Sequence, residues 1–401
     1  MPRIGRTLRT GVRPPYDFVR AAMTSRSRTA NGGKPLSSEN QHRSLTRADR
    51  AARFLPPLLF VAANSVFLAL FRFVHMDTVI RIAYDVNTLV FPMLLLIGAA
   101  LAWRVDRRKG QYRRLALAWC TAALLLAAVR LYATHIEPRN LQVRHLEIAL
   151  DQVKRPFTIL HISDIQSAGI GGYEAHVFER IRALKPDLIL HTGDFLQPLG
   201  GRTHAGELPK LAALFETLNP PLGMYTVEGE SDARLRGATP EELGGIQFIH
   251  SEPLEIRDGD LRIRLFGLAL AQTRNRSHVP LNLIVPWIEE RPQGAVNIML
   301  GHRPDYIPHV MDLPIDLCLA GHTHGGQVRL PFYGPIVTSS AVPRAWARGY
   351  REAGQTRIHV SAGIGAGHNK GLPSIRINCP PEMTLIHVVP EKYAAPHSDR
   401  P

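Results

Sequence analysis

A chain of 401 residues is longer than a usual single domain, so two or three structural units are expected. The formal net charge of +14 at pH 7 suggests a nucleic-acid partner, but the charge is unevenly placed, because residues 1–53 hold 12 Lys and Arg against 3 acids. Residues 131–401 hold 27 Lys and Arg against 28 acids, so this large part is nearly neutral and no nucleic-acid partner is expected.

The N-terminal third predicts a basic tail and a membrane anchor. Residues 1–52 are rich in Arg, Ser, Thr, Pro and Gly, which is typical of a disordered tail. Over residues 53–134 there are three apolar stretches, at 54–71, 86–103 and 115–129, and the third lengthens if it continues to Tyr132. About 17–20 apolar residues cross a bilayer, so we expect about three transmembrane helices. A buried soluble helical bundle is the alternative, although these stretches show no polar face.

The charges between the stretches predict an orientation. Segment 104–114 has six Lys and Arg and one acid, whereas the expected 72–85 loop has two of each. By the positive-inside rule, the tail and segment 104–114 are cytoplasmic and the 72–85 loop is not. Three spans then give a multi-pass protein of the inner or plasma membrane with its large domain on the outer, extracytoplasmic face. If the third stretch does not cross, the domain stays inside.

Residues 140–392 alternate short apolar strands with helical stretches, which predicts an α/β core. The expected strands are 145–150, 157–162, 187–191, 224–227, 261–268, 296–300, 316–319, 358–361 and 383–389. The expected helices and helical turns are 173–184, 207–218, 282–290 and 305–311. Residues 393–401 are expected to form a C-terminal tail.

Polar residues gather directly after five of these strands, where open α/β sheets build their sites. The five segments are SDIQ (163–166), HTGD (191–194), VEGESD (227–232), LGHR (300–303) and GHTH (321–324). Each places a carboxylate or an imidazole after an apolar run. Carboxylates and imidazoles together can hold two divalent ions that clamp a phosphoryl group, so the pattern indicates a two-metal site.

The order of these segments resembles the calcineurin-like metallophosphoesterase family, whose pattern is Asp-x-His, Gly-Asp, Gly-Asn-His-Asp or -Glu, His, and Gly-His-x-His. The GHTHGG run at 321–326 and the RINCPPE run at 376–382 resemble a branch with an N-terminal membrane anchor, which includes phosphodiesterases that act on lipid-linked substrates. The resemblance covers roughly residues 145–390. It implies two sheets packed face to face with helices outside, two divalent metal ions such as Mn, Zn or Fe, and hydrolysis of a phosphodiester or pyrophosphate bond.

Carried over residue by residue, the resemblance implies a ligand set. Asp164 and His324 would bind a first metal, Asp194 would bridge, and His302 and His322 would bind a second.

Two segments depart from the family pattern. Gln166, a weaker neutral ligand, stands where the family has a metal-binding His. Glu230 and Ser231 stand where the family has Asn and His. Glu230 can replace the Asn as an oxygen ligand and adds a negative charge. Ser231 has no pKa near neutrality and cannot take over proton transfer unaided, so no catalytic residue is assigned.

Plainer interpretations remain open for single residues. Asp164 and Asp194 could cap helices, His302 could lie on the surface, and Gln166 could be an ordinary loop residue. We expect a membrane-anchored, metal-dependent phosphoesterase whose substrate is a phosphate-ester small molecule or a lipid-linked compound. The alternative is a catalytically weak or inactive membrane protein that binds metal or phosphate as a sensor or scaffold.

Overall fold

The structure is a computed structural model that describes residues 47–70, 76–105, 112–274, 279–365, 367 and 374–393. Residues 1–46 of the expected basic tail and residues 394–401 of the expected C-terminal tail lie outside the described residues. Helix α1 (Arg47–Leu70) includes positions 47–52, so the expected boundary at residue 52 is wrong by several residues.

Four helices precede the sheets. After α1 come α2 (Met76–Asp85), a π-helical turn η1 (Val86–Val90) and α3 (Phe91–Val105). Helix α4 (Arg113–Leu131) continues through a π-helical turn η2 (Tyr132–Ile136) and a 3-10 turn η3 (Glu137–Arg139). The expected 72–85 loop is therefore wrong over 76–85. The i, i+4 pair of Arg81 and Asp85, 2.8 Å apart, supports helix there instead.

Two of the described helical segments are long and apolar enough to cross a membrane, judged by length and composition. They are Thr78–Arg104 and Arg113–Arg139, whereas the apolar part of α1, Leu55–Phe67, is shorter. Helices α3 and α4 pack through small residues, and a Cβ on Gly98 would lie 2.9 Å from the Trp119 ring. The anchor of three spans remains a prediction.

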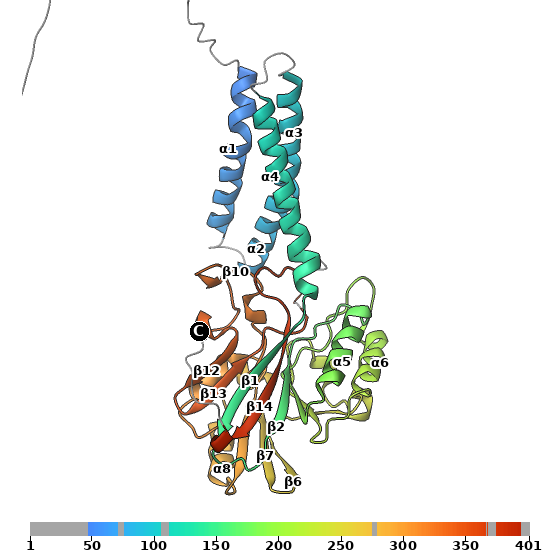
Figure 1. The fold of residues 1–401 in the computed structure, drawn as a ribbon, viewed down its shortest axis with the longest axis vertical. Coiled ribbons are helices and arrows are strands. Elements are labelled where there is room, and N and C mark those ends of the chain that lie inside the picture. Colours follow the sequence, from blue (N-terminus) through green and yellow to red (C-terminus); the bar gives the residue numbers. More distant parts are fainter. Residues whose placement is uncertain are drawn as a thin grey trace, which may run out of the picture. The chain divides into compact units, whose positions relative to one another are not determined.

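Two six-stranded sheets follow the helices (Figure 1). The first has the order β1 (Gln142–Leu150), β14 (Glu382–Pro390), β2 (Phe157–Ile162), β3 (Leu188–His191), β4 (Met224–Thr226) and β5 (Ile246–Phe248). The second has the order β12 (Gly349–Ala353), β13 (Thr356–Val360), β9 (Leu317–Ala320), β8 (Ala295–Leu300), β7 (Leu261–Gly267) and β6 (Pro253–Asp258). A separate hairpin consists of β10 (Arg329–Leu330) and β11 (Gly334–Pro335).

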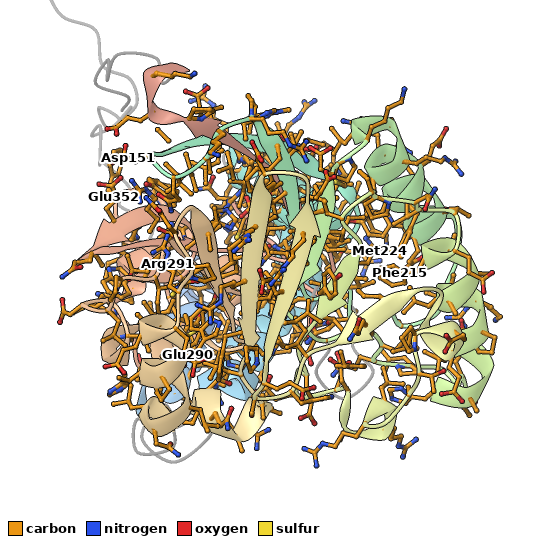
Figure 2. All side chains as sticks on the ribbon, turned by 90° about the horizontal axis from the view of Figure 1, so that it is seen from below. Asp151, Phe215, Met224, Glu290, Arg291 and Glu352 are labelled. Carbon is orange, nitrogen blue, oxygen red and sulfur yellow. The ribbon has the colours of Figure 1, made fainter. Side chains whose placement is uncertain are left out.

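The central strands are buried on both faces, and alternate residues enter different cores. In β2, Ile159 joins the core between the two sheets, whereas Leu160 joins the core under α5 (Gly172–Leu184) and α6 (His204–Phe215). In this second core, Phe215 of α6 packs with Met224 of β4 (Figure 2).

The second sheet is covered in the same way. Met299 of β8 joins a third core with Trp287 of α8 (Leu281–Glu289) and Tyr306 of the 3-10 helix η7 (Pro304–His309). Another short helix, α7 (Leu270–Arg274), follows β7. The two sheets thus face each other with helices outside, which is the arrangement that the resemblance implies.

Most of the expected strands and helices are present with small shifts. Helix α6 begins at His204 rather than at 207, because the Thr203 hydroxyl accepts a hydrogen bond from the Gly206 N–H and caps the helix there. The expected helical turn at 305–311 is the 3-10 helix η7.

Candidate metal centre

The seven predicted ligands all follow the carboxyl ends of central strands. Asp164 and Gln166 follow β2, Asp194 follows β3, and Glu230 follows β4; these three strands are parallel neighbours in the first sheet. His302 follows β8, and His322 and His324 follow β9; these strands are parallel neighbours in the second sheet. Because parallel neighbours end at one edge, each sheet gathers its own set of polar side chains there.

Five of these residues have a backbone conformation that is uncommon outside glycine. The φ angles are 49° for Asp164, 35° for Gln166, 66° for Asp194, 66° for His322 and 48° for His324. Such conformations cost roughly 1–3 kcal/mol each and persist only where the surroundings fix them. They turn each chain sharply after its strand.

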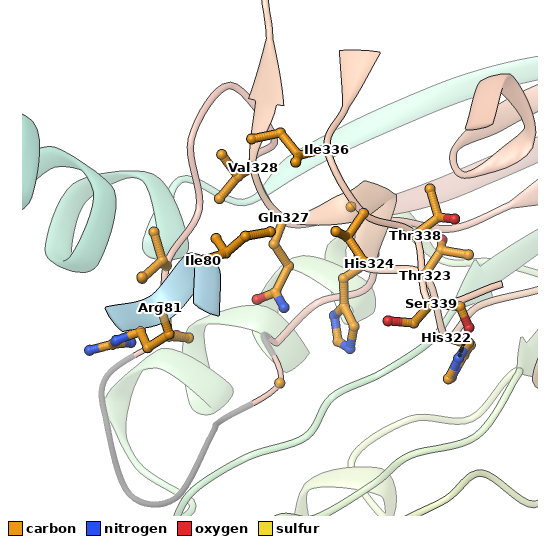
Figure 3. A pocket seen from close by; sticks show the side chains of 15 residues that line it. Ile80, Arg81, His322, Thr323, His324, Gln327, Val328, Ile336, Thr338 and Ser339 are labelled. Atoms are coloured by element: carbon orange, nitrogen blue, oxygen red, sulfur yellow. Dashed lines mark hydrogen bonds between the residues drawn. The ribbon is translucent and has the colours of Figure 1, made fainter. Parts of the chain in front are cut away.

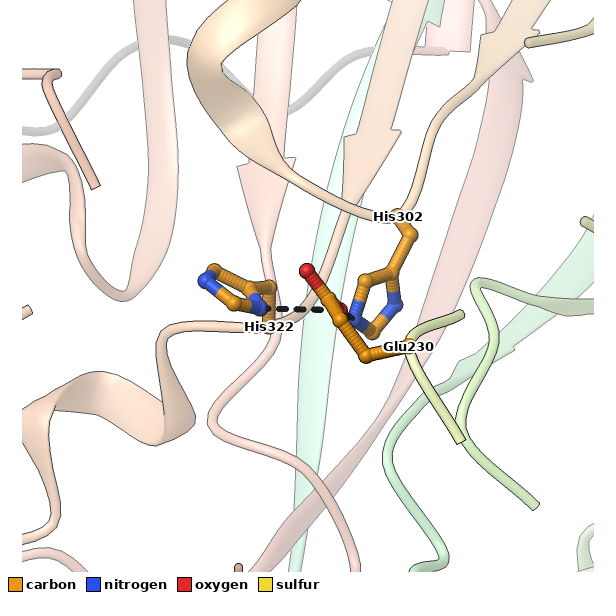
Figure 4. Close-up of side chains that lie close together, drawn as sticks. All are labelled: Glu230, His302 and His322. Atoms are coloured by element: carbon orange, nitrogen blue, oxygen red, sulfur yellow. Dashed lines mark hydrogen bonds and ion pairs between the residues drawn. The ribbon is translucent and has the colours of Figure 1, made fainter. Parts of the chain in front are cut away.

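The first group of ligand atoms joins the two sheets around Glu230 (Figure 4). Oε2 of Glu230 lies 2.5 Å from Nε2 of His302 and 3.2 Å from Nδ1 of His322. The two imidazole rings meet edge to face with centroids 5.2 Å apart. A carboxylate oxygen and two imidazole nitrogens within 4.8 Å of one another could hold one divalent ion.

The second group shares His302 and consists otherwise of buried carboxylates. Asp164, Asp194 and His302 also offer ligand atoms within 4.8 Å of one another. Nε2 of His302 lies 3.5 Å from Oδ2 of Asp194, and Nε2 of His324 lies 3.5 Å from Oδ1 of Asp164. The side chain of Gln166 enters this group as well, because its Nε2 donates a hydrogen bond to Oδ2 of Asp194.

Two backbone carbonyls fix which nitrogen of each imidazole faces the centre. Nδ1 of His302 lies 2.6 Å from the Thr192 carbonyl oxygen, and Nε2 of His322 lies 3.1 Å from the Ser339 carbonyl oxygen. A carbonyl only accepts, so those nitrogens carry the hydrogen. Nε2 of His302 and Nδ1 of His322 therefore face the centre. A carbonyl that orients an imidazole from behind is the usual support of a metal-binding histidine.

At the candidate metal centre, several carboxylates lie close together and are buried away from water. Burial raises the pKa of Asp164 to about 6, with the charge of Asp194 acting in the same direction. Burial opposes protonation of His302, but the carboxylates of Asp194, Glu230 and Asp164 outweigh it and hold the pKa of His302 well above its usual range. A bound cation would relieve this repulsion.

The donors present fit divalent metal ions. Carboxylate oxygens and imidazole nitrogens suit Mn, Fe and Zn. Oε1 of Gln166 is buried and accepts no hydrogen bond from a described residue, although such an acceptor normally has a partner. That oxygen is available as a neutral ligand.

Ser231 and Asp232 make hydrogen bonds that hold Asp194 and the neighbouring loops in place. The N–H and the hydroxyl of Ser231 both donate to Oδ1 of Asp194, at 2.7 and 3.1 Å. The fully buried carboxylate of Asp232 accepts from the N–H groups of Asp194, Phe195 and Gly229 at 2.6–2.9 Å. Asp232 is therefore a clamp between the loops after β3 and β4.

A glycine lets these loops approach His302. Gly193 has φ of 93°, and a Cβ there would lie 2.7 Å from the Gly229 nitrogen and 2.9 Å from Nδ1 of His302. Any side chain would push the imidazole away from the Thr192 carbonyl.

The structure contradicts two of the plainer interpretations, namely helix capping by Asp164 and Asp194 and a surface position for His302. Asp164 and Asp194 cap none of the described helices, and their carboxylates face imidazoles. His302 is fully buried, and Gln166 is buried against Asp194. Sequence reasoning missed the carbonyls of Thr192 and Ser339. Thr192 lies within the HTGD segment (191–194), whereas nothing in the sequence marks Ser339.

Comparison with known proteins agrees with this geometry. The model of the family described as calcineurin-like phosphoesterase matches residues 157–326. The phosphodiesterase YaeI of Escherichia coli is 35% identical over 269 residues, which cover 64% of this chain and 92% of that protein.

Two other relatives extend the comparison. The uncharacterized metallophosphoesterase YkuE of Bacillus subtilis is 28% identical, over 64% of this chain and 88% of its own length. The UDP-2,3-diacylglucosamine pyrophosphatase LpxG of Chlamydia trachomatis is 25% identical, over 65% of this chain and 93% of its own length. With the matched residues enclosing all seven predicted ligands and reaching from β2 to the GHTHGG run, the chain belongs to the calcineurin-like phosphoesterase family, a family of metal-dependent hydrolases.

Proposed function

We propose that this protein is a membrane-anchored phosphoesterase that uses two divalent metal ions to hydrolyse a phosphodiester or pyrophosphate bond in a lipid-linked phosphate compound. One observation carries the proposal. Five strand ends from two sheets converge on two groups of ligand atoms that share His302.

The proposed ligand set is the one that the family resemblance implies, and the contacts among these side chains support it. Asp164, Gln166 and His324 would hold one ion, and Glu230, His302 and His322 would hold the other, with Asp194 between them. Such ions polarise a phosphoryl oxygen and lower the pKa of a bound water. Three carboxylates against two divalent ions leave one positive charge, which suits an anionic phosphate.

Arg303 supplies further positive charge beside the centre. Its Nη1 lies 3.5 Å from Oε1 of Glu230, and its guanidinium also donates to the Ser339 carbonyl that orients His322. An arginine held in this way can pair with phosphate oxygens as negative charge develops on them.

The absence of an acid at position 231 bears on the bond that is cleaved. An alkoxide leaving group needs a proton, whereas a leaving phosphate, whose second pKa is about 6, departs without one. Ser231 donates both of its hydrogens to Asp194 and Asp232 is held by three N–H groups. We therefore favour a pyrophosphate bond, or an ester with a good leaving group, over a simple alkyl ester.

The helices support the membrane part of the proposal. Their outward faces expose large apolar side chains, among them Met93, Ile97 and Leu124, which are 58%, 55% and 69% exposed. Such faces are costly in water and favourable in lipid. The basic 104–114 segment joins α3 to α4, and the phosphoesterase domain follows the other end of α4. If the basic segment is cytoplasmic, the domain is extracytoplasmic, which a topology reporter fused after Pro401 would test.

A chromogenic phosphodiester tests the catalytic proposal. Full-length protein is assayed with bis(p-nitrophenyl) phosphate and Mn, Zn, Fe or Mg. Metal-dependent turnover is expected, with loss in Asp194→Asn and no loss in Asp151→Asn, which changes an exposed carboxylate outside the site.

A second candidate function is supported by Gln166 and Ser231, which weaken the family's ligand and acid positions. It is a membrane protein that binds metal or phosphate as a sensor or scaffold without turnover. Tight metal binding, lost in Asp194→Asn, with no hydrolysis of any phosphate ester would favour it.

A further inference from the structure

We infer that helix α2 of the anchor supplies part of the substrate site, with Arg81 binding a phosphate group and Ile80 contacting an alkyl segment of the substrate. This inference rests on the proposed function, and it adds a substrate class: an amphiphilic phosphate ester whose apolar segment lies close to its phosphate.

A cavity joins the candidate metal centre to α2. It has a volume of about 300 Å³, at the lower end of small-molecule pockets, and it reaches the centre at His322 and His324. Ile80 and Arg81 lie on one side of this cavity and the two histidines lie on the other (Figure 3). The cavity is therefore walled jointly by the anchor and by the loop after β9.

The wall of the cavity is partly apolar and carries no negative charge. Val328, Ile336 and Ile375 line it together with Ile80, and none of the described residues that line it is an acid. Arg81 and the two histidines are its only titratable lining groups among the described residues. Such a lining suits an anion attached to a hydrocarbon segment and disfavours an organic cation.

Arg81 is held in place by a charge network between two helices. Its Nε donates to Oδ2 of Asp85 at 2.8 Å, and Nη1 of Arg130 in α4 donates to Oδ1 of the same carboxylate at 2.8 Å. Nη1 of Arg130 also donates to the Thr88 hydroxyl at 3.0 Å. One carboxylate thus holds both guanidinium groups in place. A preorganised, partly buried arginine is a favourable phosphate site.

The cavity also adjoins an exposed apolar hairpin tip. Val328 and Ile336, which line the cavity, flank the β10–β11 hairpin. The hairpin carries Leu330, Phe332 and Tyr333, which are exposed large apolar residues, and Phe332 is the most exposed of this kind in the described chain. Exposed aromatic side chains favour a bilayer interface, so a hydrocarbon segment could reach the cavity directly from lipid.

The test measures binding rather than turnover. Full-length protein loaded with Mn in phospholipid nanodiscs is titrated calorimetrically with methyl phosphate and with butyl phosphate. Butyl phosphate is expected to bind at least about tenfold more tightly, because each buried methylene contributes about a fourfold gain. Arg81→Gln should weaken both ligands about tenfold, and Arg81→Lys should weaken them less. Ile80→Trp should abolish the difference between the two ligands by filling the apolar space.

Matched controls lie on the same helical segment. Arg104→Gln and Ile82→Ala change exposed residues outside the cavity and should alter neither affinity. Retained Mn binding shows that each variant is folded. Equal affinities for methyl and butyl phosphate, or an Arg81→Gln protein that matches Arg104→Gln, would overturn the inference.

The two proposals fail in different ways. Hydrolysis of bis(p-nitrophenyl) phosphate without any preference for butyl phosphate would refute substrate binding in the cavity, while the proposed phosphoesterase activity would stand. Preference for butyl phosphate with no turnover under any metal would refute the enzyme and leave the cavity as a binding site for amphiphilic phosphates.

Discussion

The two halves of the candidate metal centre are built differently. The first sheet contributes carboxylates and an amide from three loops, and these loops contain all the departures from the family pattern: Gln166, Glu230 and Ser231. The second sheet contributes three histidines that keep the pattern. Its imidazoles His302 and His322 are each fixed by a backbone carbonyl, whereas the carboxylates of the first half bind N–H groups and hydroxyls.

This difference teaches which features of the site depend on side-chain identity. The histidine half needs one defined tautomer in each ring, and only an imidazole meets that need. The carboxylate half supplies charge and oxygen atoms. Glu230 can therefore replace the family's Asn, and Gln166 the family's His, with a change in metal affinity. The comparison predicts that positions 166, 230 and 231 of the first half tolerate substitution, whereas the histidines of the second half do not.

The largest effect is expected in the histidine half. His302→Gln removes the one residue that both groups of ligand atoms share, so we expect turnover to fall on the order of 10³-fold and metal content to fall with it. Metal analysis and a phosphodiesterase assay of the same preparation measure this. His250→Gln, an exposed histidine outside the site, is the control. Near-normal turnover in His302→Gln would show that the histidine half does not depend on the imidazole of this residue.

A gain of activity is expected in the carboxylate half. Ser231→His restores an imidazole at the position where the family has its proton-transfer group, while the backbone N–H to Asp194 remains. Turnover of an alkyl phosphodiester should rise about 10²-fold, and turnover of a pyrophosphate bond should change little, because only the alkoxide needs a proton. Equal changes for both substrates would show that position 231 does not act on the leaving group.

A smaller effect is expected where the two sheets meet. His161 of β2 and His359 of β13 are buried and hydrogen-bonded through their Nδ1 atoms at 2.7 Å. Burial lowers the pKa of His359 to about 4 and holds the pKa of His161 well below its usual range. The unfolded chain therefore binds protons below pH 6.5 that the folded chain does not. Stability is full above pH 6.5 and falls as the pH drops toward 4, by about 1.4 kcal/mol per pH unit and histidine.

Thermal unfolding of metal-free protein at pH 7.5 and pH 5 measures this dependence. The unfolding midpoint should drop on acidification by less in His359→Gln than in the parent chain, because one buried histidine is gone. A midpoint drop of the same size in both proteins would show that the histidine pair is not linked to acid sensitivity.

The sequence predicts the central strands because their signal is local, whereas the seven candidate ligands are implied by the family resemblance and by the polar segments that follow five strands. A buried strand is a continuous apolar run, and a polar residue directly after it lies at the sheet edge. The edge strands β5, β6 and β12 were missed, because they are short or half exposed and owe their pairing to a neighbour. The sequence predicts a loop in place of α2, because residues 76–85 lie between two apolar stretches and include the charged Asp77, Arg81 and Asp85.

Long-range contacts explain what the sequence could not show about the site. The Ser339 carbonyl reaches His322, and Arg81 reaches the cavity beside His324, through segments far apart along the chain. Neither residue belongs to a recognisable motif, so only the folded arrangement places it there.

The central claim is that the two halves together bind a pair of ions. Crystals of the protein grown with Mn, measured for anomalous scattering, test it directly. We expect two peaks about 3.5–4 Å apart, one against Glu230, His302 and His322 and one against Asp164 and His324, with Asp194 between them. A single peak elsewhere, or none at these side chains, would contradict the account.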